Sequence, residues 1–127
     1  MDQKIRDFRD LLAWQEAHKL VLMIYTTTKK FPREELYSLT DQIRRACVSI
    51  TSNIAEGFGR QGMKEKIQFY YLAQGSLTEV KNQIITATDI GYNNKEDCSR
   101  ILGQADHAHK LLQGLISKSK SFLNLKS

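Results

Sequence analysis

Apolar residues recur every three or four positions along almost the whole chain. That spacing places them on one face of an α-helix, which repeats about every 3.6 residues. The pattern falls into four runs and predicts helices over about residues 10–30, 36–58, 63–90 and 95–122. No segment alternates apolar and polar residues as a half-buried β-strand does. The sequence therefore predicts an all-α fold.

Prolines and glycines mark where these helices are expected to end. The first helix should stop before Phe31–Pro32, because the residue before a proline is sterically pushed out of the helical conformation. The segment Gly57–Gly62 has three glycines in six residues, which predicts a helix stop followed by a turn. Gly91 suits the left-handed position that commonly follows the last turn of a helix.

Short polar side chains lie near the start of two of the predicted helices. Ser38 and Asp41 have the spacing of a capping box, in which two side chains satisfy free amides at a helix start. The pair Asn93–Asn94 supplies an N-cap for the last helix. Both features favour helix starts close to these positions.

Four helices joined by short connections predict an antiparallel up-down-up-down four-helix bundle, with residues 1–127 forming a single domain. The third helix is apolar over a wide arc and is therefore expected to be the most buried. Its Tyr70 and Tyr71, together with Trp14 in the first helix, exceed what one bundle core needs. Such a surplus favours contact with another subunit.

Composition narrows the class of protein further. The 127 residues include one proline and seven glycines, which argues against collagen-like, disordered and many-turned all-β proteins. The charged first residues and short apolar runs predict neither a signal peptide nor a membrane helix, which needs about 20 apolar residues. We therefore expect a cytoplasmic protein with reduced thiols. Cys47 and Cys98 are expected to be packing residues.

No pattern of residues predicts catalysis, a metal or a cofactor. The segment Gly57–Gly62 spells the dinucleotide-binding pattern G-x-G-x-x-G, but a helix precedes it where that site requires a strand. His107 and His109 are two residues apart, so they point in different directions from one helix. We expect His109 to border the core and His107 to face water. The sequence thus favours a protein that is not an enzyme.

Polar residues interleave with the apolar stripes of the second and third helices. Because unpaired buried charges are costly, we expect these residues to bond one another across the helix pair. Arg45 is expected to form a buried pair with Glu79 or Glu56. A network that fixes helix register or a subunit contact is the first interpretation, and a ligand-binding or catalytic role is the alternative. The set comprises Gln42, Arg45, Asn53, Glu56, Ser76 and Glu79.

Lysines and arginines outnumber acidic residues by 19 to 14, which gives a formal charge of +5. The basic residues gather near the end of the first helix, along the second and third, and along the fourth. Such groups meet phosphates in nucleic-acid-binding proteins, although a merely solvated cationic face accounts for the charge equally well. The candidate nucleic-acid-binding residues are Lys29, Lys30, Arg33, Arg44, Arg60, Lys64 and Lys66, followed by Lys110, Lys118 and Lys120.

Several blocks of the sequence resemble the 23S rRNA intervening-sequence protein family. They are Phe8–Gln15, Gln42–Ala46, the Asn-Ile-Ala-Glu-Gly block at 53–57 and the Gly-Ser-Leu-x-Glu block at 75–79. The last two blocks are specific to this family when they occur together, although neither would suffice alone. The resemblance implies an antiparallel four-helix bundle assembled as a homopentameric ring, with no catalytic residues. It also implies kinship with a group in which a basic pentamer is an accessory subunit that engages nucleic acid and a reverse transcriptase.

Two functions are therefore open. The first is a non-enzymatic, homo-oligomeric bundle that binds RNA or another nucleic acid through its basic faces. The alternative is a structural or protein-interaction scaffold, an accessory subunit of a larger complex without direct nucleic-acid binding. Phosphate contacts weaken steeply with salt, so the salt dependence of binding separates the two.

Overall fold

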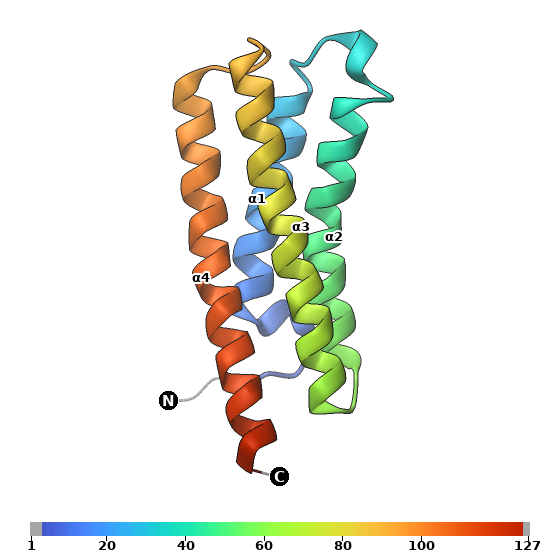
Figure 1. Cartoon of the computed structure of the whole chain (residues 1–127), viewed down its shortest axis with the longest axis vertical. Helices are drawn as coiled ribbons and strands as arrows, with labels where there is room; N and C mark the ends of the chain where they lie inside the picture. The colour runs from blue at the N-terminus through green and yellow to red at the C-terminus, as the bar shows by residue number, and fades with distance from the viewer. Residues whose placement is uncertain (1–3, 126–127) are drawn as a thin grey trace.

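Four long helices lie side by side along one axis, as Figure 1 shows. The structure, a computed structural model, describes residues 4–125. Each helix runs antiparallel to the one before it and packs against it, and α4 returns to pack against α1, which confirms the predicted up-down bundle. Within the described range no helix is both long and apolar enough to cross a membrane. In chain order the elements are the 3-10 helix η1 (Phe8–Asp10), α1 (Leu12–Thr28), the 3-10 helix η2 (Arg33–Glu35), α2 (Leu39–Gly59), α3 (Met63–Asp89) and α4 (Lys95–Leu125).

The helix boundaries lie within a few residues of those predicted. The helix α1 begins at Leu12 rather than near residue 10, because η1 occupies the preceding turn and is capped by the side chain of Asp7. It ends at Thr28, before Phe31–Pro32 as expected. The helix α4 continues to Leu125, about one turn beyond the predicted end.

The start of α2 departs from the prediction. The element η2 and a turn occupy residues 33–38, so the helix begins at Leu39 rather than near residue 36. Ser38 has φ −128° and ψ −109°, which is not the extended conformation of a capping serine, and its side chain makes no capping hydrogen bond. The expected capping box with Asp41 is therefore wrong. Instead, the Leu39 N–H donates to Oε1 of Glu35 at 3.3 Å.

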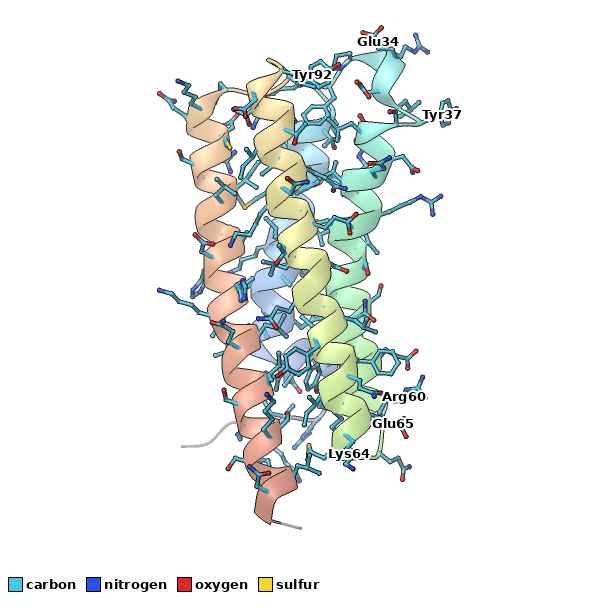
Figure 2. All side chains as sticks on the ribbon, viewed as in Figure 1. Glu34, Tyr37, Arg60, Lys64, Glu65 and Tyr92 are labelled. Carbon is cyan, nitrogen blue, oxygen red and sulfur yellow. The ribbon has the colours of Figure 1, made fainter. Side chains whose placement is uncertain are left out.

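The connection between α3 and α4 has the predicted chemistry. Gly91 has φ 93°, a left-handed conformation that glycine adopts without a Cβ clash. The Asp97 N–H donates to Oδ1 of Asn94 at 2.7 Å, so Asn94 caps α4. Tyr92 lies at the same end of the bundle, where Figure 2 labels it, and its hydroxyl donates to Oε2 of Glu35 at 2.8 Å. That bond ties this connection to η2.

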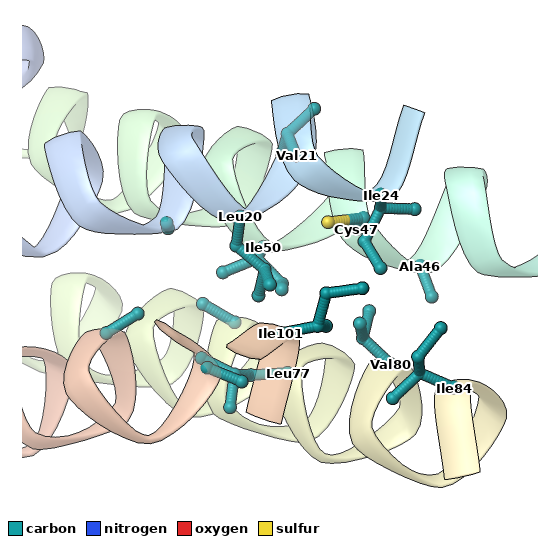
Figure 3. Close-up of a cluster of buried hydrophobic side chains, with 14 of the residues drawn as sticks. Leu20, Val21, Ile24, Ala46, Cys47, Ile50, Leu77, Val80, Ile84 and Ile101 are labelled. Atoms are coloured by element: carbon teal, nitrogen blue, oxygen red, sulfur yellow. The ribbon is translucent and has the colours of Figure 1, made fainter. Parts of the chain in front are cut away.

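Branched aliphatic side chains from all four helices fill the core, and Figure 3 shows one section of it. One such side chain from each helix has no exposed surface: Leu20, Ile50, Leu77 and Ile101. Cys47 lies among them and Cys98 is also buried, so both cysteines are packing residues as expected. Burial raises the pKa of the Cys47 thiol to about 12, which keeps it protonated and unreactive.

The helices α2 and α3 approach closely at Gly57. A Cβ atom added there would lie 2.7 Å from Cε1 of Tyr70 and 3.0 Å from Cβ of Phe69. Tyr70 is itself buried, so its ring has no free space into which it could move. The glycine that ends the Asn-Ile-Ala-Glu-Gly block is therefore required by packing.

The expectation that α3 is the most buried helix is wrong. Its apolar residues Tyr71, Leu72 and Ile85 are exposed, with 56% of Leu72 accessible to solvent. Eight of the 27 residues of α3 are buried, against seven of 17 in α1, because the apolar arc of α3 is wider than the face that α2 and α4 cover. Trp14 is half-buried, and its ring stacks on His18 with the ring centroids 4.7 Å apart.

Candidate functional site

The sequence-predicted basic residues do not form one surface. One group gathers where α1 connects to α2, at the upper end of the bundle in Figure 1, and consists of Lys29, Lys30, Arg33 and Arg44. We call this group the basic end. A second group surrounds the α2–α3 turn at the opposite end, and a third follows α4. The three groups have different surroundings, which decide what each cation can bind.

Arg44 is held in place from α1. Its Nε donates to Oγ1 of Thr28 at 2.8 Å, and its guanidinium carbon lies 4.7 Å from the centroid of the Tyr25 ring. Thr28 is buried and donates its own hydroxyl proton to the carbonyl of Ile24 at 2.7 Å. These contacts fix the guanidinium of Arg44 and leave its terminal N–H groups available. The sequence places Thr28 on the apolar stripe of α1 and gives no sign that it orients an arginine.

The segment that carries Arg33 is also held in place. The rings of Phe31 and Tyr92 lie 5.7 Å apart, and the Tyr92 hydroxyl bonds to Glu35 at the end of η2. That hydrogen bond lowers the pKa of the Glu35 carboxyl. Just beyond, Tyr37 projects from the bundle with 92% of its surface exposed, as Figure 2 shows. Sequence analysis includes Tyr37 in the predicted second helix, off its apolar stripe, whereas the structure places it in the α1–α2 connection with its ring exposed.

The basic end lacks acidic partners. Across residues 4–125, no carboxylate lies within ion-pair distance of any of its four cations. Other surface cations do have such partners: Arg9 pairs with Asp7, Lys19 with Glu16, and Arg100 with Asp97. The four cations of the basic end therefore form no ion pair in the described part of the chain, although Glu34 and Glu35 follow Arg33 in the sequence.

At the opposite end, the charge of Arg60 is largely compensated. Its guanidinium nitrogens lie 3.6 Å from carboxylate oxygens of both Glu56 and Glu65, and its guanidinium carbon lies 4.8 Å from the centroid of the Phe69 ring. Figure 2 shows Arg60, Lys64 and Glu65 close together at this end. Arg60 is thus a weaker candidate for phosphate contact than the sequence predicts, whereas Lys64 is exposed.

Lys66 has a structural task at the same turn. Its Nζ donates to the carbonyls of Phe58 at 2.6 Å and Gly57 at 3.4 Å, and lies 5.4 Å from the centroid of the Phe58 ring. Partial burial lowers the pKa of the Lys66 ammonium. Because the last carbonyls of a helix lack partners and carry partial negative charge, Lys66 caps the C-terminus of α2.

The basic residues of α4 lie on two different sides of the helix, one towards α1 and one towards α3. Lys110 and Lys118 line an apolar groove of about 460 Å³ between α4 and the start of α1, together with Leu12 and Leu115. Lys120 lies with its Nζ 5.0 Å from the centroid of the Tyr71 ring. These lysines are exposed but lie away from the basic end.

The polar network on α2 and α3 is smaller than predicted. Ser49 joins the helices through a 2.9 Å hydrogen bond to Ser76, and the Asn53 side-chain amide donates to Oγ of Ser49 at 3.0 Å.

The predicted buried pair of Arg45 with Glu79 or Glu56 is wrong. The Arg45 side chain is 80% exposed and bonds to Asp41 at 2.9 Å, while Glu56 faces Arg60 at the surface. Glu79 accepts from the side-chain amide of Gln83, and Gln42 is exposed. Arg45 and Glu56 lie beside the apolar stripe of α2 and face solvent rather than α3, so Arg45 cannot form a buried pair with Glu79 or Glu56.

The histidines lie where the sequence predicts. His109 is half-buried, and its Nε2 lies 2.8 Å from the amide nitrogen of Gln74. Burial is the main cause that lowers the pKa of His109. His107 is exposed, with Nε2 3.6 Å from Oε1 of Glu16. Nowhere in the described chain do three or more His, Cys, Asp or Glu side chains gather in a way that could hold a metal ion.

Comparison with known proteins supports both the fold and the family. Residues 9–114 match the model of the family described as 23S rRNA-intervening sequence protein. Among solved structures, the chain is similar to a protein with unknown function from the S23 ribosomal protein family of Bacteroides thetaiotaomicron VPI-5482, whose crystal structure has a resolution of 1.70 Å. The two chains are 21% identical, with a TM-score of 0.76 over 83% of this chain and 98% of the other. The comparison with curated proteins gave no match.

These findings fix the family but not an activity. The structural relative has unknown function, and neither comparison assigns a catalytic role. The family match includes the Asn-Ile-Ala-Glu-Gly and Gly-Ser-Leu-x-Glu blocks and most of all four helices. The chain belongs to the 23S rRNA-intervening sequence protein family.

Proposed function

We propose that this protein is a non-enzymatic binding module that engages RNA or another nucleic acid through the basic end. The observation that carries the proposal is the gathering of Lys29, Lys30, Arg33 and Arg44 without an ion-pair partner in the described chain. Cations without partners meet phosphates at lower cost, because no existing ion pair has to break. Arg44, held by Thr28 and Tyr25, also loses little side-chain freedom on binding.

The exposed ring of Tyr37 supports the same proposal. Nucleic-acid-binding surfaces combine cations that meet the backbone with aromatic side chains on which unpaired bases stack. Tyr37 lies four residues after Arg33 and has 92% of its surface free. The combination favours single-stranded or looped RNA, whose bases are accessible for stacking.

The experiment is a fluorescence-anisotropy titration of a labelled structured RNA at low salt. The basic-end variant Lys29→Gln/Arg33→Gln/Arg44→Gln removes three cations that have no acidic partner. The matched control Arg9→Gln/Lys19→Gln/Arg100→Gln also removes three charges, but each of these cations already has a carboxylate partner. We expect the basic-end variant to bind every RNA more weakly and the control to bind like wild type. Absence of binding by the wild type, or an equal loss in both variants, contradicts the proposal.

We further propose that the bundle functions as a homo-oligomer, the pentamer that the family resemblance implies. The exposed apolar side chains of α3, above all Leu72, support self-association because such residues are usually covered in stable assemblies. Light scattering on the wild type should give a mass several times the 14.6 kDa of one chain. Leu72→Glu should reduce that mass, and a wild type that is monomeric would refute this part.

The same exposed apolar face favours one alternative, a scaffold that recruits a protein without touching nucleic acid. Apolar contacts persist in salt, whereas phosphate contacts weaken. A pull-down that survives nuclease treatment and high salt, combined with no RNA binding in the anisotropy titration, would favour the scaffold.

A further inference from the structure

The basic end contains a pocket of about 220 Å³ between the α1–α2 connection and the first turn of α2. Lys29, Arg33 and Arg44 line it, and none of its lining residues in the described chain is acidic. The volume is below the roughly 300–1,000 Å³ that is usual for drug-sized ligands. Size and charge together suit a small anion.

Thr40 in the first turn of α2 also lines this pocket. Only 3% of Thr40 is exposed, and its Oγ1 has no hydrogen-bond partner among residues 4–125. Thr28 lines the same pocket with the same 3% exposure, yet its hydroxyl both donates and accepts a hydrogen bond. Since buried hydroxyls in native proteins are nearly always paired, the unpaired hydroxyl of Thr40 points to an acceptor that a ligand supplies.

The start of α2 adds a further positive contribution. Helix N-termini present free amides and a partial positive charge, and they bind phosphate for this reason. At α2 the side chain of Ser38 makes no capping bond, and Glu35 satisfies only the Leu39 N–H. Glu35 thus caps only the first amide of α2, and the amide of Thr40 beside the pocket has no acceptor in the described chain.

The nearest acidic residues do not compete for the pocket. Glu35 accepts hydrogen bonds from Tyr92 and the Leu39 amide, and Asp41 accepts one from Arg45 on the outer surface of α2. Neither of them lines the pocket, and Glu34, which follows Arg33 in the sequence, does not line it either. The cation best placed to bind, Arg44, is already oriented by Thr28 and Tyr25, so little ordering is needed when a ligand enters.

We infer that this pocket binds a phosphate group, with the Thr40 hydroxyl donating to one oxygen and Arg44 binding through its terminal N–H groups. Lys29 and Arg33 supply the remaining positive charge at the rim. The affinity for phosphate itself is a property of the pocket. That the phosphate belongs to a nucleic acid rests on the proposed function.

The experiment is an NMR titration of the ¹⁵N-labelled full chain with inorganic phosphate, compared with sodium chloride at equal ionic strength. We expect saturable shifts centred on the amides of Thr40 and its neighbours with phosphate and not with chloride. Thr40→Val keeps the shape of the side chain and should weaken phosphate binding by about tenfold to a hundredfold, the effect of losing one hydrogen bond to a charged group. Arg44→Gln should weaken it at least as much. The control Lys19→Gln, far from the pocket on α1, should leave it unchanged.

The outcomes are distinct. A response that does not saturate, or that Thr40→Val leaves intact, overturns the pocket assignment even if RNA binds. Saturable phosphate binding without RNA binding supports the pocket and refutes the proposed function. Short RNAs with and without a 5′-phosphate then identify the source: a preference for the phosphorylated end assigns the pocket to a terminal phosphate, and equal binding that Thr40→Val weakens assigns it to the backbone.

Discussion

The clearest test of the packing at the basic end is a pair of matched substitutions, Thr40→Val and Thr28→Val. Both threonines are 3% exposed, and valine has nearly the same shape as threonine. The Thr40 hydroxyl has no partner in the described chain, and a buried unsatisfied hydroxyl costs about 1–3 kcal/mol. Thr40→Val should therefore stabilise the ligand-free protein by about 1–2 kcal/mol.

The Thr28 substitution should have the opposite sign. Its hydroxyl oxygen accepts from Nε of Arg44 at 2.8 Å, and valine would leave that partly buried charged donor without a partner. Losing a hydrogen bond to a charged group costs about 1.5–3 kcal/mol. The expected difference between the two variants is thus about 2.5–5 kcal/mol for the same chemical change.

Urea unfolding followed by circular dichroism measures this difference, provided that the m-value is the same in both variants and the wild type. A rise in the transition midpoint for Thr40→Val and a fall for Thr28→Val supports the reasoning. If Thr40→Val instead destabilises the protein as much as Thr28→Val, then the Thr40 hydroxyl is satisfied by solvent, and the argument from its lack of a partner fails.

Three further predictions follow from other parts of the bundle. Gly57→Ala should destabilise the fold by about 1–3 kcal/mol, because the new Cβ would lie 2.7 Å from the Tyr70 ring. The control Gly103→Ala, at a position on α4 with open space around it, should stabilise the fold by about 1 kcal/mol. If urea unfolding gave similar changes in stability for the two variants, the close approach of α2 and α3 at Gly57 would be contradicted. Lys66→Met should lower stability by about 1–3 kcal/mol through loss of the α2 cap, against less than about 0.5 kcal/mol for Lys64→Met, with thermal unfolding as the measurement. The pKa of His109 is lowered from 6.5, so the unfolded chain takes up the proton first and stability is lost as the pH falls below about 6.5. His109→Gln should reduce that loss in urea unfolding between pH 7 and about pH 5, and an unchanged profile would refute the assignment.

The sequence predicts the helices well because the same burial that stabilises each helix also sets its pattern. Leu20, Ile50 and Ile101 each belong to an apolar stripe of their own helix, and residues recur along each stripe at helical spacing because one face of each helix must meet the core. The breaks are equally local, since Pro32 and Gly91 act through their own backbone conformations. The fold class needs little more than these two kinds of signal.

The surroundings of the polar residues could not be predicted in the same way. The spacing of Arg45 places it beside the apolar stripe of α2, but whether that flank meets α3 or solvent depends on how the packed helices are rotated. A start of α2 three residues later than predicted, with Glu35 in place of a capping serine, likewise depends on contacts of η2 with Tyr92 across the bundle.

Sequence analysis also treats all basic residues alike, whereas the fold separates them. Arg60 is compensated by two glutamates, and Lys66 is occupied with the end of α2. Arg44 has a threonine and a tyrosine ring as neighbours instead of an acid. The partners of Arg60 and Lys66 lie nearby along the chain, and Thr28 lies 16 residues before Arg44, but spacing alone does not state which of these pairs form.

The central claim, that the basic end binds nucleic-acid phosphates, is tested most directly by the salt dependence of RNA binding. Each phosphate contact contributes about 0.7–0.9 to the slope of log affinity against log salt concentration. The account predicts that Lys29→Gln/Arg33→Gln/Arg44→Gln, checked first for folding by circular dichroism, reduces that slope by about 2–3. The control Arg9→Gln/Lys19→Gln/Arg100→Gln should retain the wild-type slope. A basic-end variant with the same slope as the wild type would contradict the account.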